Sequence, residues 1–186
     1  MAIKRQKIIR PSWDEYFMVM AKLAASRSTC LSRPNGSVIV KGKRVIATGY
    51  NGSMPGVVHC SDEGVCFRRS IKATDAGKYD FCRSIHSEAN AIAQSSKMGI
   101  SVEGATLYNT LAPCYVCTKL LVSAGIKKVF YEYEYKSIDK KRDKLWKEAV
   151  IDSGIEIKQL RVKPETIKYI VPFIENITAH RRLKSE

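Results

Sequence analysis

The strongest constraint on the fold comes from the second half of the chain, where short apolar runs alternate with helical segments. Helices are predicted over 86–98, 114–124 and 138–152, and strands over 105–109, 129–133 and 155–162. Gly125 and Gly154 stand where the last two of these helices end. Strands that alternate with helices of this length form βαβ units, in which consecutive strands are parallel. The pattern therefore predicts an α/β fold with a partly parallel sheet.

The first half of the chain adds a helix and a hairpin. Ser12-Trp13-Asp14-Glu15 forms a capping box and is followed by apolar residues at helical spacing, which predicts a helix over 13–26. Two β-type runs, 37–40 and 44–50, are separated only by Lys41-Gly42-Lys43, as in a hairpin. Residues 52–83 are rich in turn residues. We expect them to form a long insertion loop that is functional or held in place by a ligand.

Length and composition narrow the class of protein. The 186 residues suit a single domain, with a core over about 12–160, the insertion 52–83 and a basic helix or tail over 164–186. There is no membrane-spanning run, and no apolar stretch follows the basic residues at the N-terminus, so a cytoplasmic location is expected. The 32 basic and 18 acidic residues give a net charge of +14, which favours polyanionic partners such as nucleic acid, nucleotides or an anionic surface.

Two short motifs carry the chemistry. His86-Ser87-Glu88 precedes Pro113-Cys114-Tyr115-Val116-Cys117. A catalytic zinc site needs three protein ligands and an open position. Cys114 and Cys117 share a helix face, and Pro113 predicts a helix start there, where the helix dipole favours thiolates. His86 is the predicted third ligand. Glu88 is predicted to move protons between an activated water and the substrate.

The order of these motifs is more specific than either motif alone. A single Cys-x-x-Cys could be a redox pair, and a single His-x-Glu occurs often by chance. In this order, with Pro before the cysteine pair, they match the signature of the zinc-dependent nucleobase deaminases. We therefore predict a zinc-dependent hydrolytic deaminase.

The remaining cysteines form a second candidate metal site. They are Cys30, Cys60, Cys66 and Cys82. In a reduced compartment, clustered cysteines are more often metal ligands or catalytic thiols than disulfides. Four thiolates can close a tetrahedral structural zinc site, which would hold the long insertion in place. Buried apolar cysteines, or a site that uses His59 instead of one thiol, remain the alternatives.

Several stretches together resemble the deoxycytidylate deaminase family, and most closely its small bacterial and bacteriophage members. They are Thr48–Gly52, Cys60–Glu63, Phe67–Arg69, His86–Ile92, Gly104–Tyr108, Pro113–Cys117 and Ala124–Val129. The resemblance covers about residues 12–160 and implies a three-layer α/β/α sandwich around a mixed sheet of about five strands. It also implies hydrolysis of dCMP to dUMP and ammonia for thymidylate synthesis. The implied enzyme is a hexamer that dCTP activates and dTTP inhibits, each with Mg²⁺.

The resemblance also assigns residues. It places the catalytic zinc on His86, Cys114 and Cys117, gives the proton shuttle to Glu88, and implies a second zinc near the other four cysteines. The predicted substrate residues are Asn51, Arg33, Ser87, Ala112 and Tyr115, with the backbone near Leu111 at the base edge. The predicted effector residues are Tyr50, Gly52, Arg68 and Arg69. Arginines are chosen for the phosphates because a guanidinium forms two parallel hydrogen bonds with them.

Three points remain open at this stage. Asn51-Gly52 is also a turn signal, so Asn51 could equally be a turn residue in the left-handed conformation. The chain departs from its relatives at Pro34-Asn35 and at Ser87, where alanine is more usual. One alternative function is deamination of cytosine or adenine in nucleic acid, but an insertion that covers the pocket would exclude a polymer strand. The other is a catalytically inactive, zinc-stabilised binding module, in which Glu88 would have no role.

Overall fold

A mixed five-stranded sheet forms the centre of the computed structural model, which describes residues 10–73, 80–135 and 140–175. The strands are β1 (Gly36–Lys41), β2 (Arg44–Tyr50), β5 (Thr106–Leu111), β6 (Lys128–Tyr133) and β7 (Glu156–Gln159), in the order β2-β1-β5-β6-β7. β1 is antiparallel to both β2 and β5, whereas β5, β6 and β7 are parallel. The predicted α/β class and mixed five-stranded sheet are confirmed.

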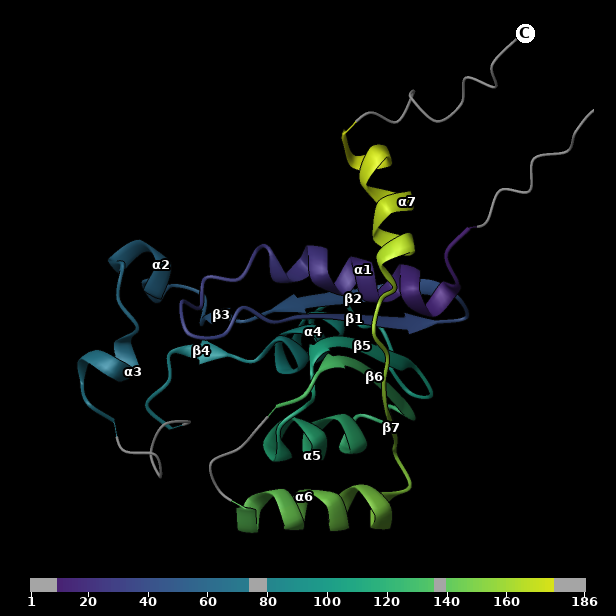
Figure 1. Ribbon diagram of the computed structural model, residues 1–186. Helices are drawn as coiled ribbons and strands as arrows, with labels where there is room; N and C mark the ends of the chain where they lie inside the picture. The colour runs from purple at the N-terminus through teal and green to yellow at the C-terminus, as the bar shows by residue number, and fades with distance from the viewer. Residues whose placement is uncertain (1–9, 74–79, 136–139, 176–186) are drawn as a thin grey trace, which may run out of the picture.

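Helices cover both faces of this sheet (Figure 1). α1 (Trp13–Ala25) packs on one face against β1, β5 and β2. On the other face, α4 (Ser87–Lys97) packs on β2 and β1, and α5 (Tyr115–Ser123) lies beside α4. α6 (Lys140–Ser153) contacts α5, and α7 (Pro164–Glu175) projects away from the sheet on the α1 side (Figure 1). The result is the predicted α/β/α arrangement.

Alternation along the strands divides the core between these two faces. Val38 and Val40 join the cluster under α1, whereas Ile39 between them joins the cluster under α4 and α5. Leu107 and Tyr108 divide in the same way. Successive strand residues point to opposite faces, so a sheet covered on both sides is apolar at consecutive positions.

The insertion contains more regular structure than the sequence predicts. Strand β3 (Gly52–Ser53) pairs antiparallel with β4 (Ser84–Ile85), so the two ends of the insertion meet. Between them lie the short helices α2 (Cys60–Glu63) and α3 (Phe67–Ser70). In its described residues, the insertion is therefore a loop that contains two short helices and is closed by a two-residue strand pair, and its function stays a prediction. Four-residue helices and two-residue strands are too short to produce a readable hydrophobic period.

Most other boundaries agree with the predictions to within a few residues. The hairpin turns through Gly42 and Lys43, both at positive φ, as a two-residue type I′ turn requires. The last strand is shorter than the predicted 155–162. Residues 138–139 of the predicted third helix and 176–186 of the predicted tail lie outside the described residues. Among the helices that are described, none combines the length and apolar character needed to cross a membrane.

The segment before α7 is fastened to α1 by a buried carboxylate. Glu15 receives hydrogen bonds from the Lys163 N–H (3.2 Å) and from the Thr166 hydroxyl (2.9 Å), in addition to the capping-box contact with Ser12 (3.0 Å). Burial acts to raise the pKa of Glu15, but these hydrogen bonds outweigh it and hold the pKa below its usual value. The capping box is thus confirmed, and its carboxylate also joins the two ends of the described fold.

Candidate active site

The first turn of α4 carries two of the predicted catalytic residues. His86 is the N-cap residue, with extended backbone (φ −68°, ψ 150°), and Glu88 is the second residue of the helix, 2% exposed. This explains how residues two apart can line one pocket. Gly49 of β2 lies directly beneath this turn, where a Cβ atom would be 2.1 Å from the Ser87 carbonyl oxygen and 2.6 Å from the Ala91 nitrogen. A glycine is therefore needed for α4 to approach the strand this closely.

The cysteine pair lies at the start of α5. Cys114 is the N-cap residue, and its Sγ accepts a hydrogen bond from the Cys117 N–H at 3.5 Å. His86 Nδ1 is 3.6 Å from Cys114 Sγ and 3.4 Å from Cys117 Sγ. Zinc with bonds of about 2.3 Å to sulfur and about 2.0 Å to nitrogen, in tetrahedral geometry, separates such ligands by about 3.5 Å. The donor set and its spacing therefore fit a zinc ion.

Proton affinities in this cluster are strongly perturbed. A hydrogen bond from Cys117 and the neighbouring His86 lower the pKa of Cys114 despite burial, whereas the same hydrogen bond together with burial raises the pKa of Cys117. Hydrogen bonding to Cys114 raises the pKa of His86, against the effect of burial. Burial raises the pKa of Glu88, although the charge of His86 acts in the opposite direction. A carboxyl group with a raised pKa is suited to accept and return a proton near neutrality.

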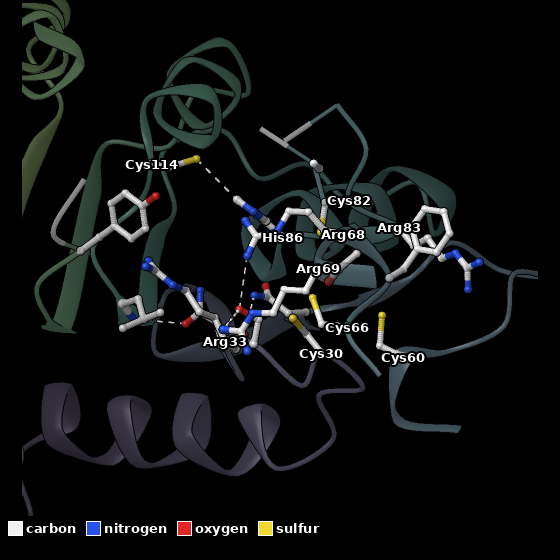
Figure 2. Close-up of a pocket in the computed structure, with 18 of the residues that line it drawn as sticks. Cys30, Arg33, Cys60, Cys66, Arg68, Arg69, Cys82, Arg83, His86 and Cys114 are labelled. Atoms are coloured by element: carbon white, nitrogen blue, oxygen red, sulfur yellow. Dashed lines mark hydrogen bonds between the residues drawn. The ribbon is translucent and has the colours of Figure 1, made fainter. Parts of the chain in front are cut away.

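A cavity of about 390 Å³ opens from this cluster (Figure 2). His86, Glu88 and Cys114 line one part of it, together with Leu111 and Ala112, the predicted base-edge residues. Five cationic side chains also line it: Arg33, Arg68, Arg69, Lys72 and Arg83. Glu88 is the one acidic residue among the described residues of the lining. The cavity thus combines a metal-binding end with a wall suited to anions.

Comparison with known proteins identifies the family. The model of the cytidine and deoxycytidylate deaminase zinc-binding region matches residues 11–133, which include all four residues of the catalytic cluster. The chain belongs to the cytidine and deoxycytidylate deaminase family. The resemblance inferred from the motifs is therefore confirmed.

Several relatives of this family can be compared directly. ComE operon protein 2 of Bacillus subtilis is 47% identical over 129 residues, 69% of this chain and 63% of that protein. The deoxycytidylate deaminase of Schizosaccharomyces pombe is 39% identical over 156 residues, 84% of this chain and 46% of the yeast protein. That of Mycobacterium phage D29 is 41% identical over 131 residues, 67% of this chain and 98% of the phage protein. The chain thus spans less than two thirds of the bacterial and yeast relatives.

A solved structure agrees with the fold. The dCMP deaminase of cyanophage S-TIM5, in complex with dCMP and dUMP, superposes with a TM-score of 0.62 and 26% sequence identity. The match covers 82% of this chain and all of the cyanophage chain. The cytidine-deaminase-like sandwich is therefore also the fold of a dCMP deaminase solved with dCMP and dUMP bound.

In this deaminase-family chain, Asn51 joins the site's elements together. Its Oδ1 accepts a hydrogen bond from the Ser87 N–H at 2.7 Å, and its Nδ2 donates to the Arg33 carbonyl oxygen at 2.8 Å. Asn51 is buried and lines the cavity, and its φ is not positive. The alternative of a left-handed turn residue is therefore wrong. Asn51 caps α4 and connects it to the segment that carries Arg33.

The other predicted nucleotide-binding residues divide into two groups. Arg33 lines the cavity, with its guanidinium 4.5 Å from the centre of the Tyr135 ring. Arg68 and Arg69, predicted to bind the effector, line the same cavity, and both reach Ser32 Oγ, at 3.4 and 3.5 Å. The remaining predicted residues, Tyr50, Gly52, Ser87 and Tyr115, are not among the described residues of the lining.

The four other cysteines also line this cavity, but their sulfur atoms do not lie as close to one another as the ligand atoms of His86, Cys114 and Cys117 do. All four line it, and Figure 2 shows them around the same hollow as His86 and Cys114. Burial raises the pKa of Cys82, and nearby Cys30 and Cys66 raise it further. Within the described residues, only the catalytic group has all its ligand atoms within 4.8 Å of one another. The alternative ligand His59 contacts the Thr29 hydroxyl through Nδ1 at 3.1 Å.

Sequence analysis missed the polar residues that support the site from behind. Ser37 and Asn109 are fully buried next to Ser87, and buried Asn35 accepts hydrogen bonds from Thr110 Oγ1 and, at 3.1 Å, from the Leu111 N–H. The available signal was their type and place, since each is a polar residue at the end of an apolar strand. Such a residue is buried only if it has a partner, and here the partners belong to the site.

Proposed function

We propose that this chain is a zinc-dependent deaminase that hydrolyses dCMP to dUMP and ammonia. The proposal is carried by one observation: a His86–Cys114–Cys117 ligand set with a buried glutamate beside it, in a cavity that cationic side chains also line. Purely structural zinc sites are closed by four ligands and need no adjacent carboxylate. Three ligands with Glu88 next to them fit a hydrolytic site.

The protein groups have separate tasks in this reaction. A zinc ion held by the three ligands would supply a nucleophilic hydroxide near neutral pH for attack at C4 of the cytosine. Glu88 accepts the proton released from the attacking water. It passes this proton to the ring nitrogen N3, then takes the proton of the hydroxyl group now on C4 and delivers it to the leaving amine, so that the C4–N bond breaks and ammonia departs. The buried surroundings of Glu88 raise its pKa and so favour this exchange in both directions.

The cavity wall supports a nucleotide rather than a nucleoside as substrate. Of the five cationic side chains, Arg83 is paired with Glu63 at 2.8 Å, and a nucleoside carries no charge that would use the other four, whereas a 5′-phosphate carries nearly two negative charges. We assign the phosphate to the side of the cavity formed by Arg33, Arg68 and Arg69. The backbone at Ala112, with the neighbouring Leu111, is assigned to the base edge, and Asn51 connects the segment of Arg33 to the start of α4. The cyanophage relative, solved with dCMP and dUMP, supports this choice of substrate.

Regulation and a second metal belong to the same proposal. We include activation by dCTP and inhibition by dTTP, each with Mg²⁺, a hexameric assembly and supply of dUMP for thymidylate synthesis, all from the family resemblance. Tyr50 and Gly52 remain candidates for effector contacts, and Tyr115 for a substrate contact. A structural zinc on Cys30, Cys60, Cys66 and Cys82 is supported by their common place in the cavity wall, and the four thiols would have to come closer together to hold it.

The direct test is ammonia release from the purified protein with dCMP, CMP, dCTP, cytidine and single-stranded DNA in parallel. Each substrate is assayed alone and with dCTP–Mg²⁺ or dTTP–Mg²⁺. We expect turnover of dCMP, increased by dCTP and suppressed by dTTP. Turnover of the DNA alone would instead support the nucleic-acid alternative that the net charge of +14 favours, and salt-dependent oligonucleotide binding would then accompany it.

Two variants separate the roles of the residues. Glu88→Gln should abolish turnover while zinc stays bound, because Glu88 is assigned as a proton shuttle and not as a ligand. Arg68→Gln should lower kcat/KM for dCMP by about tenfold or more and leave that for deoxycytidine nearly unchanged, since a charge-assisted contact to phosphate is lost. Arg44→Gln, an exposed arginine at the far end of β2, is the matched control. If kcat/KM for dCMP, measured without effector, is unchanged in Arg68→Gln, Arg68 does not bind the substrate phosphate and remains a candidate for binding the effector.

A further inference from the structure

A buried polar cluster lies immediately behind Glu88. Ser37, Ser87 and Asn109 are each 0% exposed, and none of them is among the described residues that line the cavity. Ser37 and Asn109 are paired directly across strands β1 and β5, and Ser87 is the first residue of α4. Three polar side chains so deeply buried need partners, and these do not reach the substrate. Their function must therefore be to position a neighbouring residue.

The contacts of this cluster converge on one carboxylate oxygen. Ser37 Oγ is 2.7 Å from Ser87 Oγ and 2.8 Å from Asn109 Oδ1. Ser87 Oγ is 3.1 Å from Glu88 Oε2 and 3.2 Å from Asn109 Oδ1. The amide of Asn109 is oriented by its Nδ2, which donates to the Leu111 carbonyl oxygen at 2.6 Å. Its Oδ1 therefore faces both serine hydroxyls as an acceptor.

We propose that Ser87 is a positioning residue for Glu88. Its hydroxyl, held between Ser37 and Asn109, fixes the carboxylate through Oε2 in the orientation that reaches the reacting atoms. This inference rests on the proposed deaminase function, because it assigns a part in that reaction.

The cluster also provides Glu88 with a partner throughout proton transfer. When the carboxylate is ionised, the Ser87 hydroxyl donates to Oε2. When the other oxygen, Oε1, carries the transferred proton, Oε2 remains an acceptor and keeps the same hydrogen bond from Ser87. No heavy atom needs to move between the two forms. A shuttle that stays in place in both forms avoids reorganisation during the reaction.

The same cluster connects the shuttle to the substrate's base edge. Asn109 contacts Ser87 through Oδ1 and the Leu111 carbonyl through Nδ2, and Leu111 lines the cavity. The carboxylate and the backbone assigned to the base are therefore fixed to one rigid group. Productive proton transfer needs such groups placed to within about 0.5 Å.

The test compares the variant Ser87→Ala with the wild type. Removal of this hydroxyl leaves Ser37 bonded to Asn109 Oδ1, so Glu88 Oε2 is the atom that loses its hydrogen bond, which is the contact under test. We expect kcat for dCMP to fall about tenfold, since a hydrogen bond to a charged group is lost, while KM and the zinc content stay within twofold. Ser95→Ala is the matched control, because Ser95 lies on the same helix, is 2% exposed and bonds only to the Ala91 carbonyl among the described residues. It should leave kcat unchanged.

The outcomes are distinct. A fall in kcat in Ser87→Ala, but not in Ser95→Ala, supports the proposal. Unchanged kcat, a rise in KM alone, or loss of zinc would each overturn it, because they point to no role, a substrate contact or a structural role. If the wild type releases ammonia from none of the substrates, the proposed function fails. In that case, crystal structures of the zinc-loaded wild type and of Ser87→Ala test the positioning role separately. An unmoved Glu88 carboxylate in the variant would overturn that role.

Discussion

Gly49→Ala tests whether the position of α4 controls catalysis. A Cβ atom at residue 49 would lie 2.1 Å from the Ser87 carbonyl oxygen, and real Cβ contacts are not closer than 3.0 Å. The first turn of α4 must therefore move away from β2 by about 0.9 Å. The carbonyl in question belongs to the residue between His86 and Glu88, so both shift with it.

Two effects of this displacement can be estimated. Overpacking at a buried contact destabilises a fold by about 1–3 kcal/mol, so a lower urea midpoint is expected. Misplacement of a catalytic group by about 1 Å lowers the rate by about 100-fold. We therefore expect Gly49→Ala to remain folded at 25 °C with kcat for dCMP reduced by about two orders of magnitude. The measurements are urea unfolding by circular dichroism and ammonia release at saturating dCMP.

Ala105→Val provides the comparison that isolates catalysis from stability. Ala105 is 1% exposed in the core under α4 and α5 and lies just before β5, at the opposite end of that strand from Leu111, so the added methyl groups overpack the core away from the site. Both variants should lose similar stability, and only Gly49→Ala should lose most of its kcat in the folded fraction. Equal kcat losses in the two variants, or a wild-type kcat in Gly49→Ala, would refute the argument that α4 must lie this close to β2.

Three further predictions concern metal and proton binding. Cys117→Ser should lower zinc content by about one ion per chain and remove activity; metal analysis checks this, and full zinc retention would contradict it. Cys60→Ser should lower zinc content and stability more than it changes kcat in the surviving protein; unchanged zinc would exclude Cys60 from a second site. Glu15→Gln should reduce the free energy of unfolding by about 1–2 kcal/mol at pH 7. Because the folded pKa of Glu15 lies below its unfolded value, its stabilisation is complete above the unfolded pKa and is lost as the pH falls through the folded one. The difference in urea midpoint between wild type and Glu15→Gln should therefore shrink on acidification, and a constant difference would contradict this.

The candidate catalytic residues could be placed from sequence within each motif, because their geometry there is local. His86 and Glu88 belong to one helix start, and Cys114 and Cys117 to another, so spacing along the chain fixes their relative positions within each pair. The strands and long helices were equally predictable, because each repeats its period several times. Proline before the cysteine pair marked the second helix start.

The supporting contacts could not be predicted, because they depend on register between distant segments. Ser37 meets Asn109 only because β1 and β5 pair in one register, across 72 positions of sequence. A shift of one residue would send either side chain to the other face of the sheet. The pairing of β3 with β4 is likewise two residues long and leaves no periodic signal.

Both metal-ligating segments begin at helix N-caps, and this has a consequence for how the site is held. His86 caps α4 and Cys114 caps α5, so the partial positive charges of two helix starts meet at the thiolates and favour their ionised form. As a consequence, the distances between His86 and the two cysteines depend on how the two helices are placed relative to each other. Gly49 sets the distance of α4 from the sheet, Asn51 caps α4 from the strand end, and Asn109 connects α4 to β5. The catalytic geometry therefore depends on these three residues, none of which touches the metal ligands' own atoms, and a change in any one should alter kcat before it alters the fold.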